Sequence, residues 1–394
     1  MRILLANAIL QQRTGTEVVT IELAQALAAR GHEVVVYTPL MGDSAEALRA
    51  RNVRVTDSLH DLDFEAEVIH GNHAVELVHA MIRYPHAPGL FVCHDPGIWF
   101  SEPPDLARIR AYVGVCGLTV RRIEQAVPRM AGRVQFVPNA VDLDRFVPRP
   151  PLPPSPLRAL ALTKHSGHLD TLRAACARAG VALDILGPGA GQVVDDLPAR
   201  LRDCDLVFAT ARMAIEAMAV GCATIVVDGR GLAGLATSRV AGEWRAMNFG
   251  MQALTRPVTE DAVLAEIARY DAGDAAAVSA SVRAAQPLSR AVEQYERLYR
   301  GIIDRHAPVP ADIQGREMSR LMQQWFPAIN GVVRACAPVA AAPVDVSPVA
   351  AAPVDASPVA APPVAATPPP EVMRAGFWNR LGRSIDKRFG PKRR

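Results

Sequence analysis

Short apolar segments alternate with longer amphipathic ones from the start of the chain, and this alternation restricts the possible folds more than any other feature. Residues 2–6 are strand-like, and residues 16–30 follow with apolar side chains at helical spacing. Gly31 ends this helix, and residues 33–37 have the pattern of a second strand. A strand, a helix and a strand in this order form a βαβ unit, which predicts a parallel sheet.

The alternation stops once, at residues 148–156, where six prolines prevent a helix or an inner strand. Further strands are expected before this stretch at 67–70, 90–93, 111–116 and 134–137, and after it at 157–162, 182–186, 205–209 and 223–227. Helices are expected after it at 169–179, 197–201, 213–220, 260–268 and 289–305. We therefore predict an α/β fold with two Rossmann-like, doubly wound domains at 1–147 and 157–306, followed by a helical extension at 307–336.

The composition changes after residue 336. Three related decapeptides occupy residues 339–368, and their prolines predict a semi-rigid spacer over 337–371. Residues 372–394 carry eight Lys or Arg against Asp386 alone, with Phe377 and Trp378 near one side of a helical pattern. This pattern is typical of an amphipathic helix at an anionic membrane surface, and a partner-docking helix or a solubilising tail is the alternative.

The composition excludes several classes of protein. Half of the residues are apolar and 21% are charged, as in a globular protein of about two domains. The longest apolar runs fall far short of the ~20 residues that cross a bilayer, and the first residues resemble a buried strand rather than a signal peptide. We therefore expect a cytoplasmic protein. Of the net charge of +3, the tail contributes +7 and the rest −4, which argues against nucleic acid as a partner.

No motif indicates a metal site, a disulfide framework or a dinucleotide site. The six cysteines are scattered without a CxxC pair, and the histidines have no repeated ligand spacing, so we expect no metal. No GxGxxG motif follows the first strand, and the glycines of 187–191 are spaced too loosely to count as one. A nicotinamide dehydrogenase is therefore disfavoured.

Four stretches resemble the retaining glycosyltransferases of the GT-B fold, specifically the family 4 type. They are Thr14 to Glu17 with the helix behind it, Val137 to Phe146, Ile215 to Gly221, and Gly229 to Leu232. In order, they are similar to the family's glycine loop, its "PNGVD…F" segment, its "LEAMAxG" donor-site helix and its glycine-rich turn. The resemblance covers roughly residues 1–305 and implies a ligand held in the cleft between the two domains.

The resemblance implies a nucleotide-sugar donor held by the second domain and an acceptor held by the first. Glu216 would accept hydrogen bonds from the ribose, and His94, at the end of the 90–93 strand, would face the sugar. Lys164 follows the first strand of the second domain and can stabilise the donor's diphosphate, although an exposed loop lysine is the alternative. We predict His94, Lys164 and Glu216 as catalytic residues.

Further donor-binding residues are predicted at strand ends and turns. Gly15 lets backbone N–H groups and the following helix approach a phosphate, although an ordinary strand-to-helix turn is the alternative. The other predicted donor-binding residues are Asp95, Asn139, Gly187, Arg212, Glu216, Gly229, Gly231 and Leu232. For Asn139, a cap on the turn between the domains is the alternative.

The sequence departs from the family pattern where charges are expected. The first of the two motif glutamates, eight positions before Glu216, is Phe208 here, and the "EGFG" segment is shortened to 210–214. The family's arginine five positions before Lys164 is Ala159. Arg212 can substitute as a cation near the diphosphate. These losses fit either a divergent transferase or a protein that binds a nucleotide-sugar without turnover.

The sequence thus predicts a glycosyltransferase that moves a sugar from a nucleotide-diphosphate donor to a glycan, lipid-linked or protein acceptor, with retention and without a metal. A nucleotide-sugar 2-epimerase has the same two-domain fold, but it needs acid–base groups beyond His94 and Asp95. A catalytically degenerate adaptor, acting through the spacer and the basic tail, is the alternative without enzymatic activity.

Overall fold

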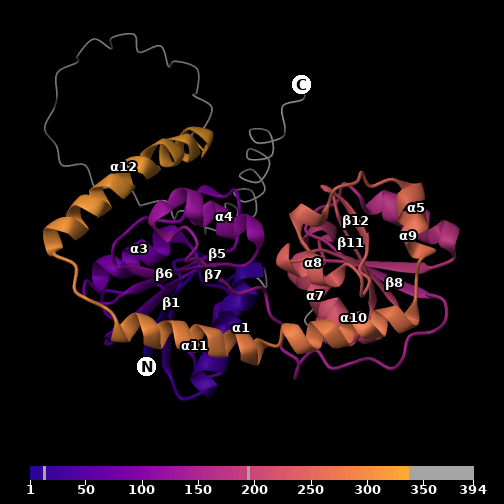
Figure 1. Ribbon diagram of the computed structural model, residues 1–394, viewed down its shortest axis with the longest axis horizontal. Helices are drawn as coiled ribbons and strands as arrows, with labels where there is room; N and C mark the ends of the chain where they lie inside the picture. The colour runs from indigo at the N-terminus through magenta and orange to yellow at the C-terminus, as the bar shows by residue number, and fades with distance from the viewer. Residues whose placement is uncertain (12–14, 193–195, 337–394) are drawn as a thin grey trace, which may run out of the picture. The chain divides into compact units, whose positions relative to one another are not determined.

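The computed structural model describes residues 1–11, 15–192 and 196–336 (Figure 1). Residues Met1–Ala335 form one compact unit. The predicted spacer at 337–371 and the basic tail at 372–394 lie outside the described residues, as does Thr14 of the glycine loop.

The unit contains two β-sheets with helices on both faces, which confirms the predicted α/β fold. The first sheet consists of β1 (Arg2–Ala6), β2 (Glu33–Tyr37), β3 (Arg54–Thr56), β4 (Val68–Gly71), β5 (Gly89–Cys93), β6 (Ile109–Gly114) and β7 (Gln135–Phe136). The second consists of β8 (Arg158–Leu162), β9 (Ala182–Leu186), β10 (Leu206–Ala209), β11 (Ala223–Asp228) and β12 (Gly231–Leu235). The α-helices are α1 (Gly15–Ala29), α2 (Asp43–Arg49), α3 (Ala74–Arg83), α4 (Gly117–Ala126), α5 (Leu169–Ala179), α6 (Leu197–Arg202), α7 (Ala211–Val220), α8 (Ala241–Ala246), α9 (Glu260–Ile267), α10 (Ala272–Ala285), α11 (Leu288–Asp304) and α12 (Ala311–Cys336). Short 3-10 helices are η1 (Trp99–Ser101), η2 (Pro128–Met130), η3 (Pro188–Ala190) and η4 (Met251–Ala253).

The first sheet is parallel throughout, in the order β3-β2-β1-β4-β5-β6-β7. Its central strands are apolar on both faces because helices cover both faces. The order reverses at β1, so the connections after β1 and β4 leave in opposite directions. In sheets of this kind, ligands bind outside the carboxyl ends of the strands at the point where the order reverses.

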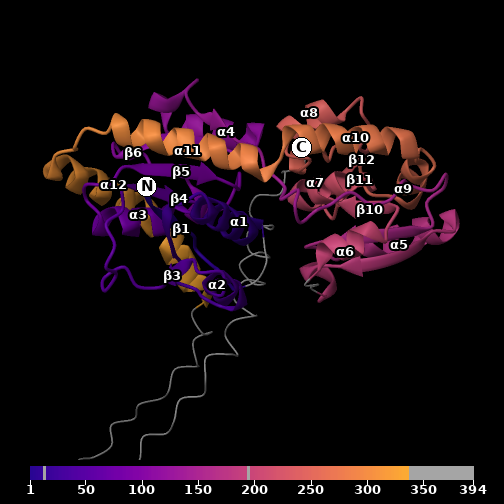
Figure 2. The ribbon, with the colours of Figure 1, turned by 90° about the horizontal axis from the view of Figure 1, so that it is seen from below.

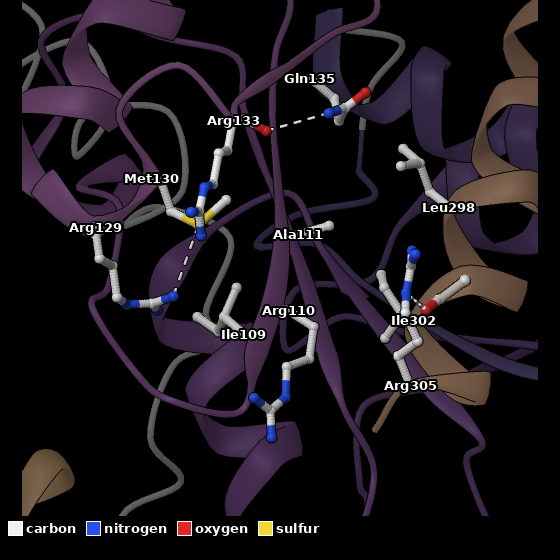
Figure 3. Close-up of a pocket in the computed structure, with 11 residues that line it drawn as sticks. Ile109, Arg110, Ala111, Arg129, Met130, Arg133, Gln135, Leu298, Ile302 and Arg305 are labelled. Atoms are coloured by element: carbon white, nitrogen blue, oxygen red, sulfur yellow. Dashed lines mark hydrogen bonds between the residues drawn. The ribbon is translucent and has the colours of Figure 1, made fainter. Parts of the chain in front are cut away.

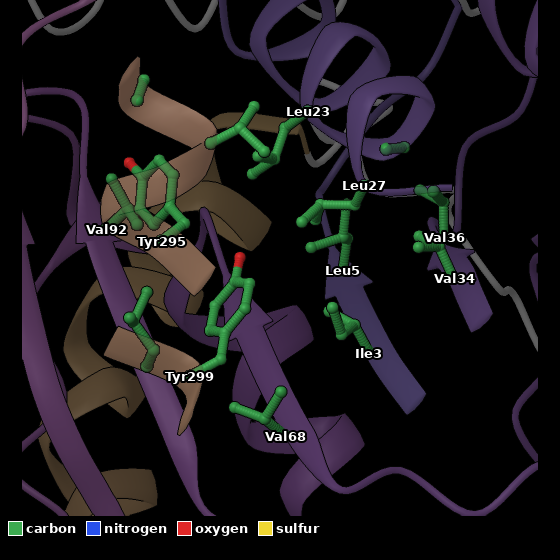
Figure 4. Close-up of a cluster of buried hydrophobic side chains, with 14 of the residues drawn as sticks. Ile3, Leu5, Leu23, Leu27, Val34, Val36, Val68, Val92, Tyr295 and Tyr299 are labelled. Carbon is green, nitrogen blue, oxygen red and sulfur yellow. The ribbon is translucent and has the colours of Figure 1, made fainter. Parts of the chain in front are cut away.

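Helix α11 packs against the first sheet, although it follows the second sheet in sequence (Figure 2). Its buried side chains recur at helical spacing and join the core of β1, β4 and α1 (Figure 4). They are Ala291, Val292, Tyr295, Tyr299 and Ile302. The sequence predicts residues 289–305 as part of the second domain. In the structure this helix packs on the first sheet instead, which corrects the prediction. An apolar stripe predicts that a helix face is covered but not which sheet covers it.

The second sheet has the order β12-β11-β10-β8-β9 and is parallel except for β12, which pairs antiparallel with β11. The sequence indicated a glycine-rich turn at 229–232. In the structure, only Gly229 and Arg230 form the turn, and Gly231 and Leu232 begin β12. A Cβ atom at residue 231 would lie 3.0 Å from the backbone oxygen of Leu254, so a larger residue there would require this segment to shift slightly.

Helix α12 lies within the expected helical extension and packs on the first domain. Leu321 and Trp325 are buried in the core that α3 and β5 share, and the Glu317 carboxylate accepts a hydrogen bond from the backbone N–H of Ala107 at 3.0 Å. Among the described helices, none combines the length and apolar composition needed to cross a bilayer.

Candidate active site

Lys164 lies at the carboxyl end of β8 and is the sole lysine among the first 386 residues. Its Nζ lies 3.5 Å from the position that a Cβ atom on Gly15 would occupy. Gly15 is the first residue of α1, so an ammonium group and the amino end of a helix meet here. Both favour a bound anion, and the missing side chain at Gly15 leaves room for them to share one.

The charges around Lys164 are mixed. Partial removal from water and the nearby Arg230 lower the pKa of Lys164, whereas Asp95 and Glu17 raise it, and the net direction is downward. A bound anion would stabilise the ammonium form and raise this pKa. The surroundings of Lys164 therefore favour an additional negative charge.

Arg230 is fixed by the preceding residues of the same turn. Its backbone N–H donates to Asp228 Oδ1 at 2.8 Å, and its guanidinium Nε donates to the same oxygen at 3.1 Å. Burial alone would raise the pKa of Asp228, but the hydrogen bonds from Arg230 lower it. Asp228 therefore stays ionised and holds the Arg230 side chain at the end of β11.

Asp95 shapes the loop after β5. Its Oδ1 accepts hydrogen bonds from the backbone N–H groups of Gly97 at 2.7 Å and Ile98 at 2.8 Å. The Arg122 guanidinium donates to the Asp95 backbone oxygen at 2.7 Å. Asp95 is also close enough to Lys164 to raise its pKa, and one of its carboxylate oxygens is already bound by its own loop.

Gly187 allows the loop after β9 to contact the loop that carries Lys164. A Cβ atom on Gly187 would lie 2.3 Å from the backbone oxygen of Thr163, and its φ of 117° is unfavourable for other residues. Gly229 lies on the other side of the same loop, and its Cβ position is 3.5 Å from His165. The predicted glycines at 187 and 229 thus border the Lys164 loop.

The substitution Gly187→Ala is expected to displace the Lys164 loop, because its methyl group would overlap the Thr163 carbonyl. Gly191→Ala is the matched control, since Gly191 also has a positive φ of 68° but no atom within 4 Å of its Cβ position. We expect G191A to cost about 1 kcal/mol of unfolding free energy and G187A about 1–3 kcal/mol more, from overlap and strain. Urea unfolding compares the two, and equal losses would contradict the proposed packing role.

His94 is held by a buried hydrogen-bond network at the carboxyl ends of β4 and β5. Its Nε2 lies 2.9 Å from Asn72 Oδ1, and the Nε2 of His70 lies 3.2 Å from the same oxygen. Asn72 Nδ2 donates to Thr20 Oγ1 at 2.9 Å, which fixes the orientation of the amide. Because an amide oxygen only accepts, both histidines donate through Nε2, and Nδ1 of His94 carries a lone pair.

The histidines of this network are neutral at physiological pH. Burial and the nearby positive charge of Arg212 lower the pKa of His94 to about 4. Burial lowers the pKa of His70 to about 3, and its Nδ1 accepts a hydrogen bond from the Tyr299 hydroxyl at 2.6 Å. His94 can therefore accept a hydrogen bond from a substrate hydroxyl through Nδ1, without carrying a charge.

The free energy of unfolding is expected to decrease as the pH falls below about 6.5, the ordinary pKa of histidine. In this range the unfolded chain protonates His70, His73 and His94, whereas the folded chain keeps them neutral. Protons then favour the unfolded state, so stability rises with pH. His70→Gln should reduce this slope by about 1.4 kcal/mol per pH unit, measured by urea unfolding between pH 5 and 6.5. The exposed His60→Gln is the control, and an unchanged slope in H70Q would refute the prediction.

Glu216 is buried in α7 and forms an ion pair with Arg212. Arg212 Nε donates to Glu216 Oε1 at 2.8 Å, and its Nη2 donates to Glu22 Oε2 of α1 at 2.5 Å. Burial alone would lower the pKa of Arg212, but the two carboxylates raise it. Burial raises the pKa of Glu216 despite the arginine. Arg212 therefore links α7 to α1. Arg212 and Glu216 were both predicted to bind the donor, and each already has a strong partner within the protein.

The chain is similar to known glycosyltransferases in sequence and in fold. The model of Glycosyltransferase Family 4 matches residues 13–145. A glycosyltransferase from Rickettsia africae ESF-5 is 13% identical with a TM-score of 0.54, covering 77% of this chain and 99% of its own. Anabaena Alr3699/HepE, solved in complex with UDP and glucose, is 14% identical with a TM-score of 0.54, covering 76% and 100%. The chain has the GT-B fold, and its residues 13–145 are similar to Glycosyltransferase Family 4. No curated protein matches the sequence.

Three predicted donor ligands of this GT-B chain make other contacts. The backbone oxygen of Asn139 accepts a hydrogen bond from Gln286 at 2.7 Å. Leu232 is fully buried in the core of the second domain, and its backbone pairs with Arg256. Gly231 packs against the same segment. The structure thus corrects the roles of Gly231 and Leu232, because the turn that would present them to a ligand is a strand.

The sequence patterns did not indicate several residues near the candidate site. Asn72 follows β4 directly, and a polar residue at a strand's carboxyl end was a usable signal. Glu22 lies in a helix of mixed composition, and no local pattern pairs it with Arg212, 190 positions away. His168 is buried, its Nδ1 has no hydrogen-bond partner, and this atom lies 3.6 Å from the Cβ position of Gly229. In the part of the chain that the structure describes, no group of three metal-binding side chains occurs.

Proposed function

We propose that the chain transfers a sugar from a nucleotide-diphosphate donor to a glycan, lipid-linked or protein acceptor, with retention of the anomeric configuration. The observation that carries this proposal is the meeting of Lys164, Gly15 at the amino end of α1, and Arg230. A diphosphate gains negative charge as its bond to the sugar breaks, and a fixed cation beside a helix amino end stabilises that charge.

In the proposed reaction, the bond between the anomeric carbon and the diphosphate oxygen breaks while the acceptor hydroxyl attacks from the same face. The hydroxyl proton passes to the departing phosphate oxygen, so atoms and charge balance. Lys164 and Arg230 stabilise the leaving group, and the neutral His94 accepts a hydrogen bond from a sugar hydroxyl through Nδ1. Positioning and electrostatics supply the catalysis in this scheme.

The comparisons support the donor class. HepE, which has the same fold, was solved with UDP and glucose, and the family 4 match covers the half that carries Gly15 and His94. The donor proposed for this chain is accordingly a UDP-, GDP- or ADP-sugar.

A protein that binds a nucleotide-sugar without transfer is the second candidate, and one observation favours it. Phe208 replaces the first motif glutamate and is buried in the core, and Glu216 is engaged by Arg212. The donor site therefore has no free carboxylate at either motif position. Donor turnover, rather than donor binding, separates the two candidates.

The test uses the full chain with a panel of UDP-, GDP- and ADP-glucose. Calorimetry measures binding, and proton NMR follows the sugar released by slow hydrolysis and its anomeric form. The transferase proposal expects one donor to bind and to release the sugar first as the anomer present in the donor. Binding without release supports the second candidate, and release of the opposite anomer contradicts retention. No binding by any donor would contradict both.

The proposal includes attachment to the inner face of a membrane through the basic tail. The support is its charge of +7 together with Phe377 and Trp378, since basic and aromatic residues favour anionic bilayer surfaces. Trp378→Ala with Phe377→Ala should weaken sedimentation with phosphatidylglycerol vesicles, and unchanged sedimentation would contradict this attachment.

A further inference from the structure

A second site lies at the opposite end of the first sheet, where the strands begin. A cavity of about 360 Å³ is bordered by the start of β6, by η2 with its following loop, by β7 and by the end of α11 (Figure 3). Its walls carry Arg110, Arg129, Arg133 and Arg305, and its apolar lining consists of Ile109, Ala111, Met130, Leu298 and Ile302. This volume is within the range of small-molecule sites, which is about 300–1,000 Å³.

Three of the four arginines lack an acidic partner. Arg129 pairs with Asp105 at 2.7 Å. Arg110 instead donates to the backbone oxygen of Ala307, and Arg305 to that of Gly301. In the described ranges, no carboxylate lies within ion-pair distance of Arg110, Arg133 or Arg305. Three exposed like charges around one cavity repel one another, and an anion between them would remove that repulsion.

The chemistry of the lining indicates which anion fits. Guanidinium groups bind phosphate oxygens through paired hydrogen bonds. Besides the arginines, Gln135 is the one polar side chain in the lining, so a sugar or a base would find few hydrogen-bond partners. The apolar side chains suit a hydrocarbon attached to the phosphate.

We propose that this cavity binds the phosphate group of an anionic lipid, with the adjoining hydrocarbon over the apolar lining. The site is separate from the candidate donor site, because Ile109 and Gln135 begin strands of the first sheet whereas His94 follows the end of a strand in that same parallel sheet. Every residue that lines the cavity belongs to the compact unit Met1–Ala335.

Calorimetry on the full chain tests the proposal with three probes below micellar concentration: dihexanoyl phosphatidic acid, dihexanoyl phosphatidylcholine and inorganic phosphate. The lipid phosphate is expected to bind more tightly than the other two. The variant R110Q/R133Q/R305Q should bind it about tenfold more weakly or worse, since charge-assisted bonds are lost. The control R202Q/R239Q/R290Q removes the same charge from exposed arginines elsewhere and should bind like the parent.

Each other outcome would overturn the proposal. Equal affinity for phosphatidylcholine, whose choline cancels the charge of its phosphate, would show that net negative charge is not recognised. Equal affinity for inorganic phosphate would assign a free anion instead. Equal weakening in both triple variants would indicate a general charge effect, and unchanged binding in R110Q/R133Q/R305Q would place the lipid elsewhere, for example on the tail. Circular dichroism and donor binding verify that the variants fold.

Discussion

Replacing Lys164 with alanine is expected to lower kcat/KM for the donor by about 10²–10³-fold, the usual cost of removing one group that stabilises charge in the transition state. Lys164 is the one lysine in the described part of the chain, and its surroundings lower its pKa in the absence of a bound anion. The loss should fall mainly on kcat, because the charge on the leaving diphosphate grows as the bond breaks. Steady-state kinetics with the donor selected by the panel measures it.

Two variants serve as controls for this substitution. Ser166→Ala changes an exposed residue of the same loop and should leave the kinetics unchanged. Lys164→Arg keeps the charge but brings a larger, planar group toward Gly15, so it should recover only part of the rate. A K164A protein as active as S166A would remove Lys164 from the mechanism.

Replacing Arg212 with methionine is expected to lower the free energy of unfolding by about 3–5 kcal/mol, because it leaves two buried carboxylates without their cation. Glu22 and Glu216 are each about 95% buried, and the Oε1 of Glu22 already lacks a hydrogen-bond partner. Burial raises the pKa of Glu216, and its protonation relieves an unpaired charge, so the loss should shrink as the pH falls toward 5. Urea unfolding at pH 7.5 and pH 5 measures both effects.

Two further variants separate the buried bridge from general effects of removing an arginine. Arg173 pairs with Asp170 in full solvent, and R173M should cost about 1 kcal/mol or less. Replacing Glu22, Arg212 and Glu216 together by methionine should restore most of the stability, because well-packed apolar groups often replace buried ion pairs without loss. A triple variant as unstable as R212M would show that the effect does not come from unpaired charge.

Local patterns were sufficient for most of the elements. The helix at 169–179 and the strands at 2–6, 33–37 and 182–186 have the bounds that their periodicity predicts, because each buries a regular apolar set. The antiparallel strand β12 was missed because its first two residues, Gly231 and Leu232, were assigned to a glycine-rich turn. The strand also has no β-branched residue that would indicate it. The sheet that α11 covers depends on tertiary packing, which no local pattern encodes.

The position of each candidate residue after its strand follows from the predicted fold. Gly15 and His94 follow strands of the first sheet, whose carboxyl ends share one edge, and Lys164 follows a strand of the second sheet. The approach of Lys164 to Gly15 joins residues of different sheets, and no local pattern indicates it. The pairing of Glu216 with Arg212 joins residues four positions apart in one helix, so helical spacing could have indicated it. The contact of Arg212 with Glu22 was not predictable, because it joins residues 190 positions apart in sequence.

The rate at which Lys164 is acylated tests whether this residue holds the donor's diphosphate. Lys164, Lys387 and Lys392 are the only lysines, so succinimidyl acetate labelling followed by peptide mass spectrometry resolves each of them. We predict that the saturating nucleoside-diphosphate sugar slows labelling of Lys164 severalfold and leaves Lys387 and Lys392 unchanged. The nucleoside alone should give no protection. Labelling of Lys164 at the same rate with and without bound donor would contradict the proposed site.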